Sequence, residues 1–528
     1  MPILFYNAKL FLNNHVSTQA DAIYVEDNKI KSVGEFEEIK DKISAKTIKI
    51  DVEQKLLLPG LIDTHTHFVQ YALAKSEIDL SSARTLDEIG EILQEYKKNM
   101  PADQKWVSGK EWNGNELKNV ERLDRKFLDK IFPDTPVSLA SKDLHTFVCN
   151  SKALEKMDLE EKKLPEGSNI GRYPNGSPNG ILEERAWLLI EEVKPKLSGK
   201  IKKQLVKETI SEAHELGLTG IHIMEEKDSY EIFNDLYQET NLQLRVCWHF
   251  PLDILDEMIK KGVKSYTGDD WLKIGGVKIF MDGSLGSETA YMFHPYKKDK
   301  NNFGYLVRSA REYYNLILHA AQNGISPTTH SIGDRCNQIV TDAIIKLMHN
   351  PEINSQTIFP RIEHFQIARP KEQEKVAQNK IYCAMQPAHV NLDAGATEKK
   401  VGKFGRNSYP FRTMLDKGAK IGFGSDVPVE TINPFHGIYA AVERKYQNDP
   451  RNESWIPSEK ISAEEAIKAY TIEAALGSQD QQMRGSIKRG KLADLIVVED
   501  YTKYDTTFWL DARSLLTMVN GKIVHNLL

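Results

Sequence analysis

The middle of the chain alternates between strand-like and helix-like segments, and this alternation limits the fold more than any other feature of the sequence. Short apolar runs rich in β-branched residues alternate with longer segments of helical pattern, which is typical of a parallel sheet with helices outside it. Eight such strands are expected, the number in a (β/α)8 barrel. They cover residues 57–63, 217–223, 243–249, 273–280, 325–330, 360–365, 381–386 and 419–425.

Both ends of the chain also have a β pattern. The first part contains the runs ILFYNAKLF, AIYVEDNKIKSVG and TIKIDVEQKLLLPG, and the last part contains GSIKRGKLADLIVVED and SLLTMVNGKIVHN. Turn residues separate these runs, as between short strands. Because the two ends of a domain often lie close together, we expect residues 1–56 and 480–528 to form one β-sandwich domain, with the barrel over residues 57–479.

The stretch between the first and second barrel strands is too long for a single crossover. We therefore expect residues 75–205 to form an inserted subdomain. It has a helical pattern in TLDEIGEILQEYKKNM, a strand in PVSLAS and a loop in GSNIGRYPNGSPNG. The expected fold class is α/β: a (β/α)8 TIM barrel with a β-sandwich domain built from both chain termini and an inserted subdomain.

Charge and cysteine usage exclude some classes of protein. The chain has 70 Lys and Arg against 75 Asp and Glu, a net charge of -5, without the basic excess of a nucleic-acid protein. Its four cysteines are far apart with no CxxC, which favours a reducing compartment, so we expect the cytoplasm. Neither a signal peptide nor a run of 18 apolar residues is visible. We expect a small-molecule substrate, no nucleic acid and no membrane; assembly into a homo-oligomer stays open.

Ionisable residues recur where the predicted strands end. His65 and His67 are two residues apart on one strand, so both imidazoles project from the same face, which is how a metal pocket begins. In barrels of this kind the active site lies at the carboxyl ends of the strands. At the later strand ends, in order, stand His222, His249, Lys278, His330, His364, the pair Gln386 and His389, and Asp426.

Several local runs resemble one enzyme family. LPGLIDTHTH, VKIFMDGSLGSETA, THSIGDRC, RIEH, MQPAH, FGSDVP and GSIKRGKLADLIVV occur in the family's order. The chain is similar over its length to the family-3 branch of the amidohydrolase superfamily, which includes N-substituted formamide deformylases. That family is a metal-dependent barrel with two histidines after the first strand, a lysine after the fourth, histidines after the fifth and sixth, and an aspartate after the eighth.

The resemblance implies a metal centre and a reaction. His65 and His67 would hold one divalent metal, and His330 and His364 a second; zinc is expected, although iron and manganese suit the same ligands. Lys278 would carry a carbamate derived from CO2 that bridges the two ions. Asp426 would bind one metal and transfer the proton. The implied reaction is hydrolysis of a carbon–nitrogen bond, in a non-peptide amide or an N-formyl group.

Each of these residues also has a plain structural explanation. His330 can be a helix-capping or core residue, His364 can pair with its charged neighbours, Asp426 can be a turn residue, and Lys278 can pair with Asp282. The candidates for substrate binding have structural alternatives too, in hydrogen bonding or loop closure. These candidates are His145, His222, Gln386 and His389.

Three departures from the family pattern bear on the substrate rather than the metal. The family often has arginine at Glu288, aspartate at Ile223 and glycine at Leu144. Among other functions, ring deamination is disfavoured because Gly333 stands where deaminases of the superfamily usually have a glutamate. Hydrolysis of a phosphotriester or lactone uses the same two-metal site and stays open. A catalytically dead scaffold is the alternative outside enzymes.

Overall fold

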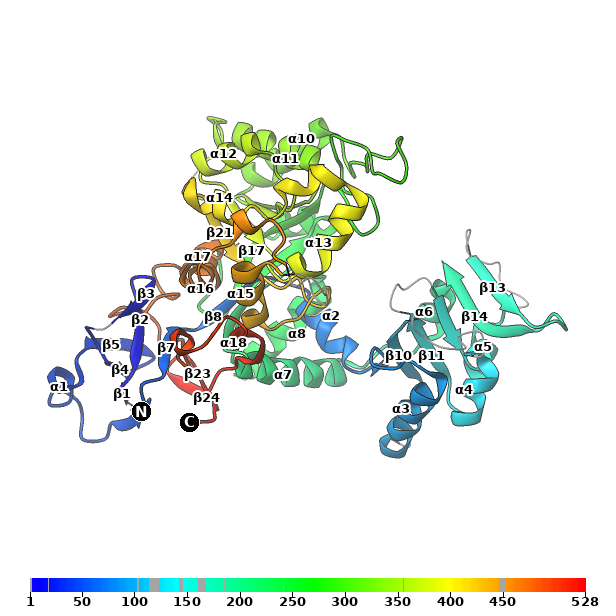
Figure 1. Ribbon diagram of the computed structural model, residues 1–528, viewed down its shortest axis with the longest axis horizontal. Helices are drawn as coiled ribbons and strands as arrows, with labels where there is room; N and C mark the ends of the chain where they lie inside the picture. The colour runs from blue at the N-terminus through cyan, green and yellow to red at the C-terminus, as the bar shows by residue number, and fades with distance from the viewer. Residues whose placement is uncertain are drawn as a thin grey trace. The chain divides into compact units, whose positions relative to one another are not determined.

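The computed structural model of the protein describes most of the chain. Its described residues are 2–17, 19–101, 104–113, 123–141, 146–159, 168–184, 186–240, 242–354, 356–445 and 453–528. They form two compact units, one of residues 1–69 and 207–528 and the other of residues 70–206 (Figure 1). The larger unit contains the barrel and both ends of the chain, and the smaller unit is the segment between the first two barrel strands.

An eight-stranded parallel sheet forms the barrel, in the order β21-β20-β19-β18-β17-β16-β15-β8. Each strand pairs with the one that precedes it along this part of the chain, which is the arrangement of a (β/α)8 barrel. The prediction of the fold class is thus confirmed. The strands are β8 (Leu61–Thr66), β15 (Leu218–Ile223), β16 (Arg245–Pro251), β17 (Leu272–Phe280), β18 (Pro327–Ser331), β19 (Arg361–His364), β20 (Tyr382–Met385) and β21 (Lys420–Phe423).

Helices follow or precede these strands along the chain. Several have apolar residues on one face and a capping residue at the start, as the helical pattern predicts. In α10, for example, Ser309 and Glu312 form a capping box. The longer helices of this unit are α7 (Gly199–Glu215), which begins in the smaller unit, α8 (Lys227–Gln238), α10 (Ala310–Gln322), α11 (Asp334–Met348), α12 (Pro370–Gln378), α13 (His389–Lys400), α15 (Pro434–Glu443) and α16 (Ala463–Tyr470).

The first predicted strand, over residues 57–63, is two strands instead of one. β7 (Leu56–Pro59) belongs to the terminal β domain, where it pairs with β22 and β2, and β8 begins the barrel. Gly60 lies between them, and a Cβ at this position would come within 2.3 Å of the Thr219 side chain. Only glycine allows the chain to pass so close to β15 as it changes sheets. The uninterrupted apolar run hides this junction from a periodicity argument.

Two segments at the carboxyl ends of β8 and β21 close the barrel. The amide of Asp426 donates to the His65 carbonyl, and the amide of His67 donates to the Val427 carbonyl, both at 2.8 Å. The buried Asp63 carboxylate accepts the amides of His65 and Ser425, each at 3.0 Å. A Cβ on Gly424 would come within 2.6 Å of the His65 amide nitrogen, so this approach requires glycine. We call these residues, 63–67 and 424–427, the closing seam.

Strands from both ends of the chain form two further sheets. One has the order β5-β4-β1-β6 and the other the order β24-β23-β22-β7-β2-β3 (Figure 1). Apolar side chains of both sheets, among them Phe5, Val25, Leu57 and Val497, share one buried cluster, as in a β-sandwich. The strands are β1 (Ile3–Tyr6), β2 (Lys9–Leu12), β3 (His15–Ser17), β4 (Ala22–Glu26), β5 (Lys29–Gly34), β6 (Ile48–Asp51), β22 (Leu495–Val498), β23 (Leu516–Val519) and β24 (Lys522–Asn526).

The smaller unit has its own sheet, in the order β13-β14-β12-β11-β10-β9, and two apolar clusters of its own. The helix and the strand expected here are α3 (Leu86–Asn99) and β11 (Val137–Ser141). The Gly-, Pro- and Asn-rich stretch expected as a loop is instead a hairpin, because Tyr173 and Ser177 pair across a tight turn with Gly176 at φ 84°. The other strands are β9 (Ile78–Asp79), β10 (Val107–Trp112), β12 (Thr146–Cys149), β13 (Ser168–Arg172) and β14 (Pro178–Glu184).

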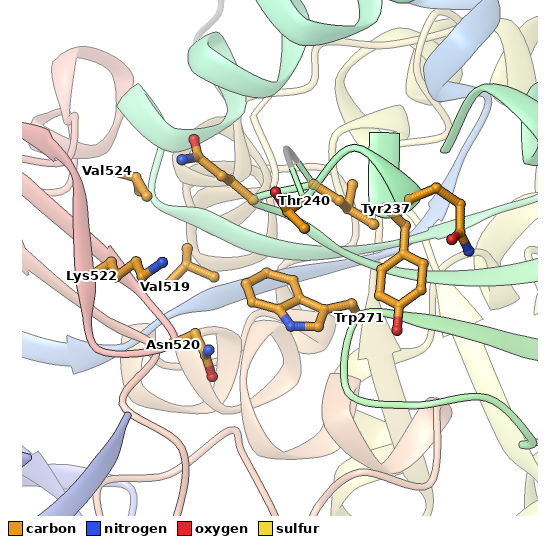
Figure 2. A pocket seen from close by; sticks show the side chains of 10 residues that line it. Tyr237, Thr240, Trp271, Val519, Asn520, Lys522 and Val524 are labelled. Atoms are coloured by element: carbon orange, nitrogen blue, oxygen red, sulfur yellow. The ribbon is translucent and has the colours of Figure 1, made fainter. Parts of the chain in front are cut away.

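A cavity of about 460 Å³ lies at the amino-terminal ends of β16 and β17, beside the β23–β24 hairpin. Figure 2 shows Trp271 at its centre, with Asn520 and Lys522 on the hairpin side. β17 begins beside this cavity, and Lys278 lies near its other end. At about 3.3 Å per residue along a strand, the cavity is roughly 20 Å from Lys278. Among the residues that the structure describes, no helix is long and apolar enough to cross a membrane.

A buried ion pair connects the barrel to the β-sandwich. The Arg245 guanidinium donates to both carboxylate oxygens of Asp494, at 2.6 and 2.9 Å. Both side chains are at most 3% exposed. Asp494→Asn leaves the arginine charge buried and unpaired, so we expect the free energy of unfolding to fall by about 3–5 kcal/mol. Denaturant unfolding of the variant and the wild type measures this difference, and equal stability would contradict it.

Candidate metal centre

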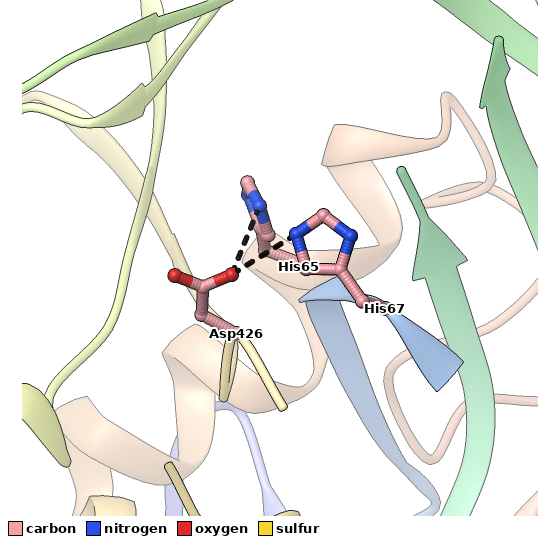
Figure 3. Close-up of side chains that lie close together, drawn as sticks. All are labelled: His65, His67 and Asp426. Atoms are coloured by element: carbon pink, nitrogen blue, oxygen red, sulfur yellow. Dashed lines mark ion pairs between the residues drawn. The ribbon is translucent and has the colours of Figure 1, made fainter. Parts of the chain in front are cut away.

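The closing seam brings three candidate ligands together (Figure 3). Asp426 Oδ1 lies 3.4 Å from His65 Nε2 and 3.3 Å from His67 Nε2. Ligand atoms of the three residues all lie within 4.8 Å of one another. With metal–ligand distances near 2.1 Å, two ligands of a tetrahedral site are about 3.4 Å apart. The geometry of these three side chains therefore fits one divalent metal ion.

The remaining candidate ligands surround the same point. Lys278 Nζ lies 3.2 Å from His65 Nε2. The His364 ring is 4.9 Å from the His65 ring and 4.5 Å from the His330 ring, measured between centroids. His364 Nδ1 is 4.0 Å from Asp426 Oδ2. All six predicted ligands, from the ends of five strands of the barrel, thus lie in one cluster, with the lysine against His65.

A buried carboxylate behind His65 sets the orientation of its ring. Glu363 Oε2 lies 2.5 Å from His65 Nδ1. Because an ionised carboxylate only accepts hydrogen bonds, Nδ1 carries the proton and Nε2 keeps its lone pair toward the cluster. Arg361 donates to both oxygens of Glu363, at 2.6 and 3.1 Å, and all three side chains are fully buried. Arg361 also donates to the Thr64 carbonyl at 2.7 Å, which attaches β19 to β8.

Sequence reasoning did not assign a role to Arg361 and Glu363 beyond pairing with His364. Both are charged residues on a four-residue buried strand, two positions apart, so they face the same side of the sheet. Because a buried charge needs a partner, two charged residues on a buried strand indicate a network of ion pairs or hydrogen bonds inside the barrel. The partner itself, His65, lies 298 positions away, and only the fold shows it.

His364 and His330 are each also held through one ring nitrogen. His364 Nδ1 donates to Gln386 Oε1 at 2.8 Å, while the Gln386 amide donates to the Ala384 carbonyl at 3.2 Å, which fixes the amide orientation. His330 Nε2 donates to the Gly283 carbonyl at 3.3 Å. The free lone pair is therefore on Nε2 of His364 and on Nδ1 of His330.

Burial and the neighbouring charges keep the imidazoles of His65 and His330 neutral. Burial, with the Lys278 ammonium, lowers the pKa of His65 to about 4 and that of His330 to about 3. Burial also lowers the pKa of Lys278 to about 8, although Glu363 and Asp426 oppose this shift. A neutral imidazole is the form that binds a metal, and a neutral amine is the form that reacts with CO2.

Asp426 is an ionised carboxylate in this environment. Burial alone would raise its pKa, but the imidazoles of His65 and His67 hold that pKa well below the usual range. Its backbone has φ of +59°, and His364 has φ of +71°. Residues other than glycine rarely adopt this conformation, and such strain concentrates at functional sites. The hydrogen bonds of the closing seam hold Asp426 in it.

The structure places the four candidates for substrate binding differently. His145 lies outside the described residues. His222 is fully buried in β15, with Nδ1 2.9 Å from an Arg361 nitrogen. Gln386 holds His364, as described above. His389, the first residue of α13, has Nε2 3.8 Å from Asp426 Oδ2 and no other partner for this buried nitrogen among the described residues. Of the three described candidates, His389 has the nitrogen most directly aimed at the cluster.

Asp282 is not the partner of Lys278. Its buried carboxylate instead accepts the backbone amides of Tyr291, Ile332 and Gly333, at 3.0, 3.0 and 2.8 Å. Burial raises the pKa of Asp282 to about 7, and these hydrogen bonds oppose the shift. Asp282 therefore ties the loop after β17 to the loop after β18, and Lys278 stays directed at the cluster.

A barrel whose strand ends gather four imidazoles, a carboxylate and a lysine has the architecture of a metal-dependent hydrolase. A model of the amidohydrolase family matches residues 49–525. The chain belongs to the amidohydrolase family, as the resemblance of its motifs predicts, and it is a hydrolase that acts on carbon–nitrogen bonds.

Relatives cover nearly the whole chain. It is 30% identical over 544 residues to "Protein LONG AFTER FAR-RED 3" of Arabidopsis thaliana. The aligned region covers 99% of this chain and 91% of that protein. It is 26% identical to the "N-substituted formamide deformylase" of Arthrobacter pascens, over 94% and 93% of the two chains. A solved uncharacterized metal-dependent hydrolase from Pyrococcus furiosus has the same fold, with a TM-score of 0.77, 24% identity and coverage of 95% and 99%.

Removing the charge of Glu363 tests its effect on His65. In Glu363→Gln the ring loses its carboxylate partner, so we expect the affinity for Zn²⁺ to fall about 10–100-fold. Calorimetric titration of the metal-free protein with zinc measures this change.

Asp494→Asn is the matched control, because Asp494 is also buried, pairs with an arginine and contacts none of the candidate ligands. Both variants should lose stability, and only Glu363→Gln should lose metal affinity. Equal zinc affinities in the two variants would contradict the orienting role.

Proposed function

We propose that the chain is a metal-dependent hydrolase that cleaves a non-peptide amide or N-formyl bond. The observation that carries this proposal is the approach of one carboxylate oxygen, Asp426 Oδ1, to the imidazole nitrogens of His65 and His67 at the spacing of metal ligands. The relationship to a formamide deformylase over nearly the full length of both chains supports this bond type.

The residues that would hold metal form two sets. His65, His67 and Asp426 would bind one ion, and His330 and His364 the second; zinc suits both sets. A bound divalent metal supplies a Lewis acid and lowers the pKa of water. Lys278, which lies against His65, would react as the neutral amine with CO2, releasing a proton and forming a carbamate, which would supply carboxylate oxygens as further metal ligands.

Asp426 is the group that moves the proton. As a carboxylate at neutral pH it accepts a proton from the water that attacks the carbonyl carbon. It then donates this proton to the nitrogen as the carbon–nitrogen bond breaks, so the products are a carboxylic acid and an amine. His389, 3.8 Å from the second oxygen of Asp426, lies where it can orient this carboxylate or contact the leaving nitrogen.

Two alternatives differ in what the structure offers them. Mononuclear deaminases of the superfamily usually have a glutamate at the position of Gly333, and a Cβ there would lie 2.2 Å from the Tyr291 carbonyl oxygen. The backbone therefore leaves no room for that side chain. Hydrolysis of a phosphotriester or lactone would use the same ligands, and assay with these substrates separates it from amide hydrolysis. A scaffold protein would purify without stoichiometric metal.

We also propose a cytoplasmic protein that acts on a small molecule and uses neither nucleic acid nor membrane as a partner. The four cysteines support a reducing compartment, because all four are unpaired and buried. Association of copies of the chain into a homo-oligomer is part of the same proposal, and analytical ultracentrifugation decides it.

Replacing Asp426 tests the proton transfer. Asp426→Asn keeps an oxygen near the two imidazoles but cannot carry a proton, so we expect turnover of an N-formyl substrate to fall about 10²–10⁴-fold with metal still bound. Steady-state kinetics with metal analysis on the same sample measures both quantities. Asp416→Asn, an exposed carboxylate on α14 (Phe411–Asp416), is the control. Full activity of Asp426→Asn would refute the assignment.

Replacing Lys278 tests the bridge. In Lys278→Ala we expect at least one metal per chain to be lost, with partial recovery of metal and activity on adding formate or acetate, whose oxygens replace those of the carbamate. Metal content by mass spectrometry is the measurement.

Lys273→Ala is the control for the bridge, since Lys273 is on the same strand, pairs with Asp480 and lies at the opposite end. With its pKa at about 8, Lys278 is neutral in roughly half the molecules at pH 8 and in about 1% at pH 6. Metal loading of the wild type in bicarbonate should therefore increase from pH 6 to pH 8. Unchanged metal content in Lys278→Ala would exclude the bridge.

A further inference from the structure

The cavity at the amino-terminal ends of β16 and β17 lies at the opposite end of β17 from the candidate metal centre (Figure 2). Its volume of about 460 Å³ is within the range of about 300–1,000 Å³ for pockets that bind small organic molecules. Its lining comes from the end of α8, the segment before β16, the start of β17 and the β23–β24 hairpin, all in the larger unit. The size fits a small ligand, and the lining residues indicate its chemistry.

Trp271 forms an aromatic wall of the cavity that the protein holds in place. Its amide donates to Asp269 Oδ1 at 2.8 Å, and its carbonyl accepts the Val246 amide at 2.8 Å, so the backbone is fixed at the start of β17. The Arg245 guanidinium carbon lies over the indole ring, 4.7 Å from the ring centroid, and Arg245 is itself bound to Asp494. One face of the indole is thus covered, and the ring lines the cavity with the surface that remains. A flat aromatic ring of a ligand can stack there.

Lys522 supplies the charge on the opposite wall. Among the residues that the structure describes, its ammonium has neither an ion pair nor a hydrogen bond, and its side chain extends toward Trp271 (Figure 2). The Asn520 side-chain oxygen accepts hydrogen bonds from Asn28 and Arg245, at 3.0 and 3.2 Å. The NH2 group of the same amide is therefore the part that remains as a donor. The hairpin side of the cavity thus offers a cation and a hydrogen-bond donor.

The acidic residue beside this wall does not line the cavity. The Asp269 carboxylate accepts the Tyr237 hydroxyl and the amides of Trp271 and Leu272, the two amides at 2.8 and 3.1 Å. These hydrogen bonds use its oxygens within the protein. None of the ten described residues that line the cavity is an aspartate or a glutamate. The charged group that a ligand meets in this lining is therefore the ammonium, and an anion is complementary to it.

We propose that this cavity is a second ligand site, separate from the metal centre, which binds a small aromatic carboxylate. The ring of the ligand stacks on Trp271, and its carboxylate pairs with Lys522 and accepts a hydrogen bond from the Asn520 amide. Because Trp271 is already held by the protein, little ordering of this wall opposes binding. Hydrogen bonds to an ionised group are also about twice as strong as those between neutral groups. This inference goes beyond the proposed function and uses no residue of the metal centre.

Three probes separate the contribution of the ring from that of the charge. Cinnamate has a flat ring and a carboxylate, cinnamyl alcohol has the same ring without the charge, and hexanoate has a carboxylate without a ring. None of them contains a carbon–nitrogen bond that the protein could cleave. In calorimetric titrations of the metal-loaded protein, we expect cinnamate to bind at least tenfold more tightly than either of the other two. Equal affinities for cinnamate and cinnamyl alcohol, or no binding of cinnamate at millimolar concentration, would overturn the proposal.

Two variants show where cinnamate binds. Lys522→Gln removes the charge from an exposed side chain, so we expect cinnamate binding to weaken about tenfold and cinnamyl alcohol binding to stay the same. Trp271→Ala removes the stacking surface and should weaken binding of both aromatic probes, with thermal unfolding as the check that this variant is folded. The matched control is Lys503→Gln, an exposed lysine in η5 (Tyr501–Lys503), which should bind as the wild type does. Wild-type affinity of Lys522→Gln for cinnamate refutes the site.

A carboxylate can also bind a metal ion, and the same titrations distinguish the two places. Cinnamate in the cavity should bind the metal-loaded and the metal-free protein with equal affinity, and Lys522→Gln should weaken both. Binding that disappears with the metal and is unchanged in Lys522→Gln belongs to the metal centre and overturns the inference. These measurements involve no turnover, so the second site can be refuted while the proposed hydrolase function stands, and the reverse is equally possible.

Discussion

Closure of the barrel is the constraint on which the rest of the structure depends. The backbone of Asp426 and Val427 bonds to the backbone of His65 and His67, with the Asp63 carboxylate between the two segments. The residues that complete the barrel are therefore also the first three candidate ligands. A sheet that stayed open would lose both the fold and the 3.3–3.4 Å spacing of the ligand atoms. Stability and metal affinity are coupled because they use the same hydrogen bonds.

A second constraint comes from charges inside the barrel. Arg361 and Glu363 face the interior from a strand where each residue is buried, and burying a charge is costly unless it is paired. Here the pairing has a direction. Arg361 neutralises the charge of Glu363, and Glu363 accepts a hydrogen bond from His65 Nδ1. The lone pair on His65 Nε2 therefore stays directed at the metal centre. Removing any one of the three exposes the other two to the full cost of burial, so substitutions along this chain of contacts should not be additive.

Much of this arrangement could be predicted from the sequence, for identifiable reasons. Seven of the eight barrel strands, all but the first, were expected close to their observed bounds, because each is an apolar run followed by a polar residue at its end. The six ligand candidates followed from their positions at those ends and from the family motifs. The junction at Gly60 could not be predicted, since residues 56–62 form one apolar run across the end of β7 and the start of β8, and only the pairing of β7 with β22 separates the two strands. The contact of His65 with Glu363 could not be predicted either, because it depends on which strands, far apart in the sequence, lie near each other in the barrel.

The sandwich joins strands from both ends of the chain, and this has a consequence for synthesis on the ribosome. Leu56 of β7 pairs with Val498 of β22, so β7 emerges long before its partner exists. Until residues 495–526 are translated, β2, β3 and β7 present an unpaired apolar edge of the kind that chaperones bind. A chain released early keeps that edge and has no complete sandwich beside its barrel. Prematurely terminated copies therefore expose this edge even when every ligand of the centre has already been made.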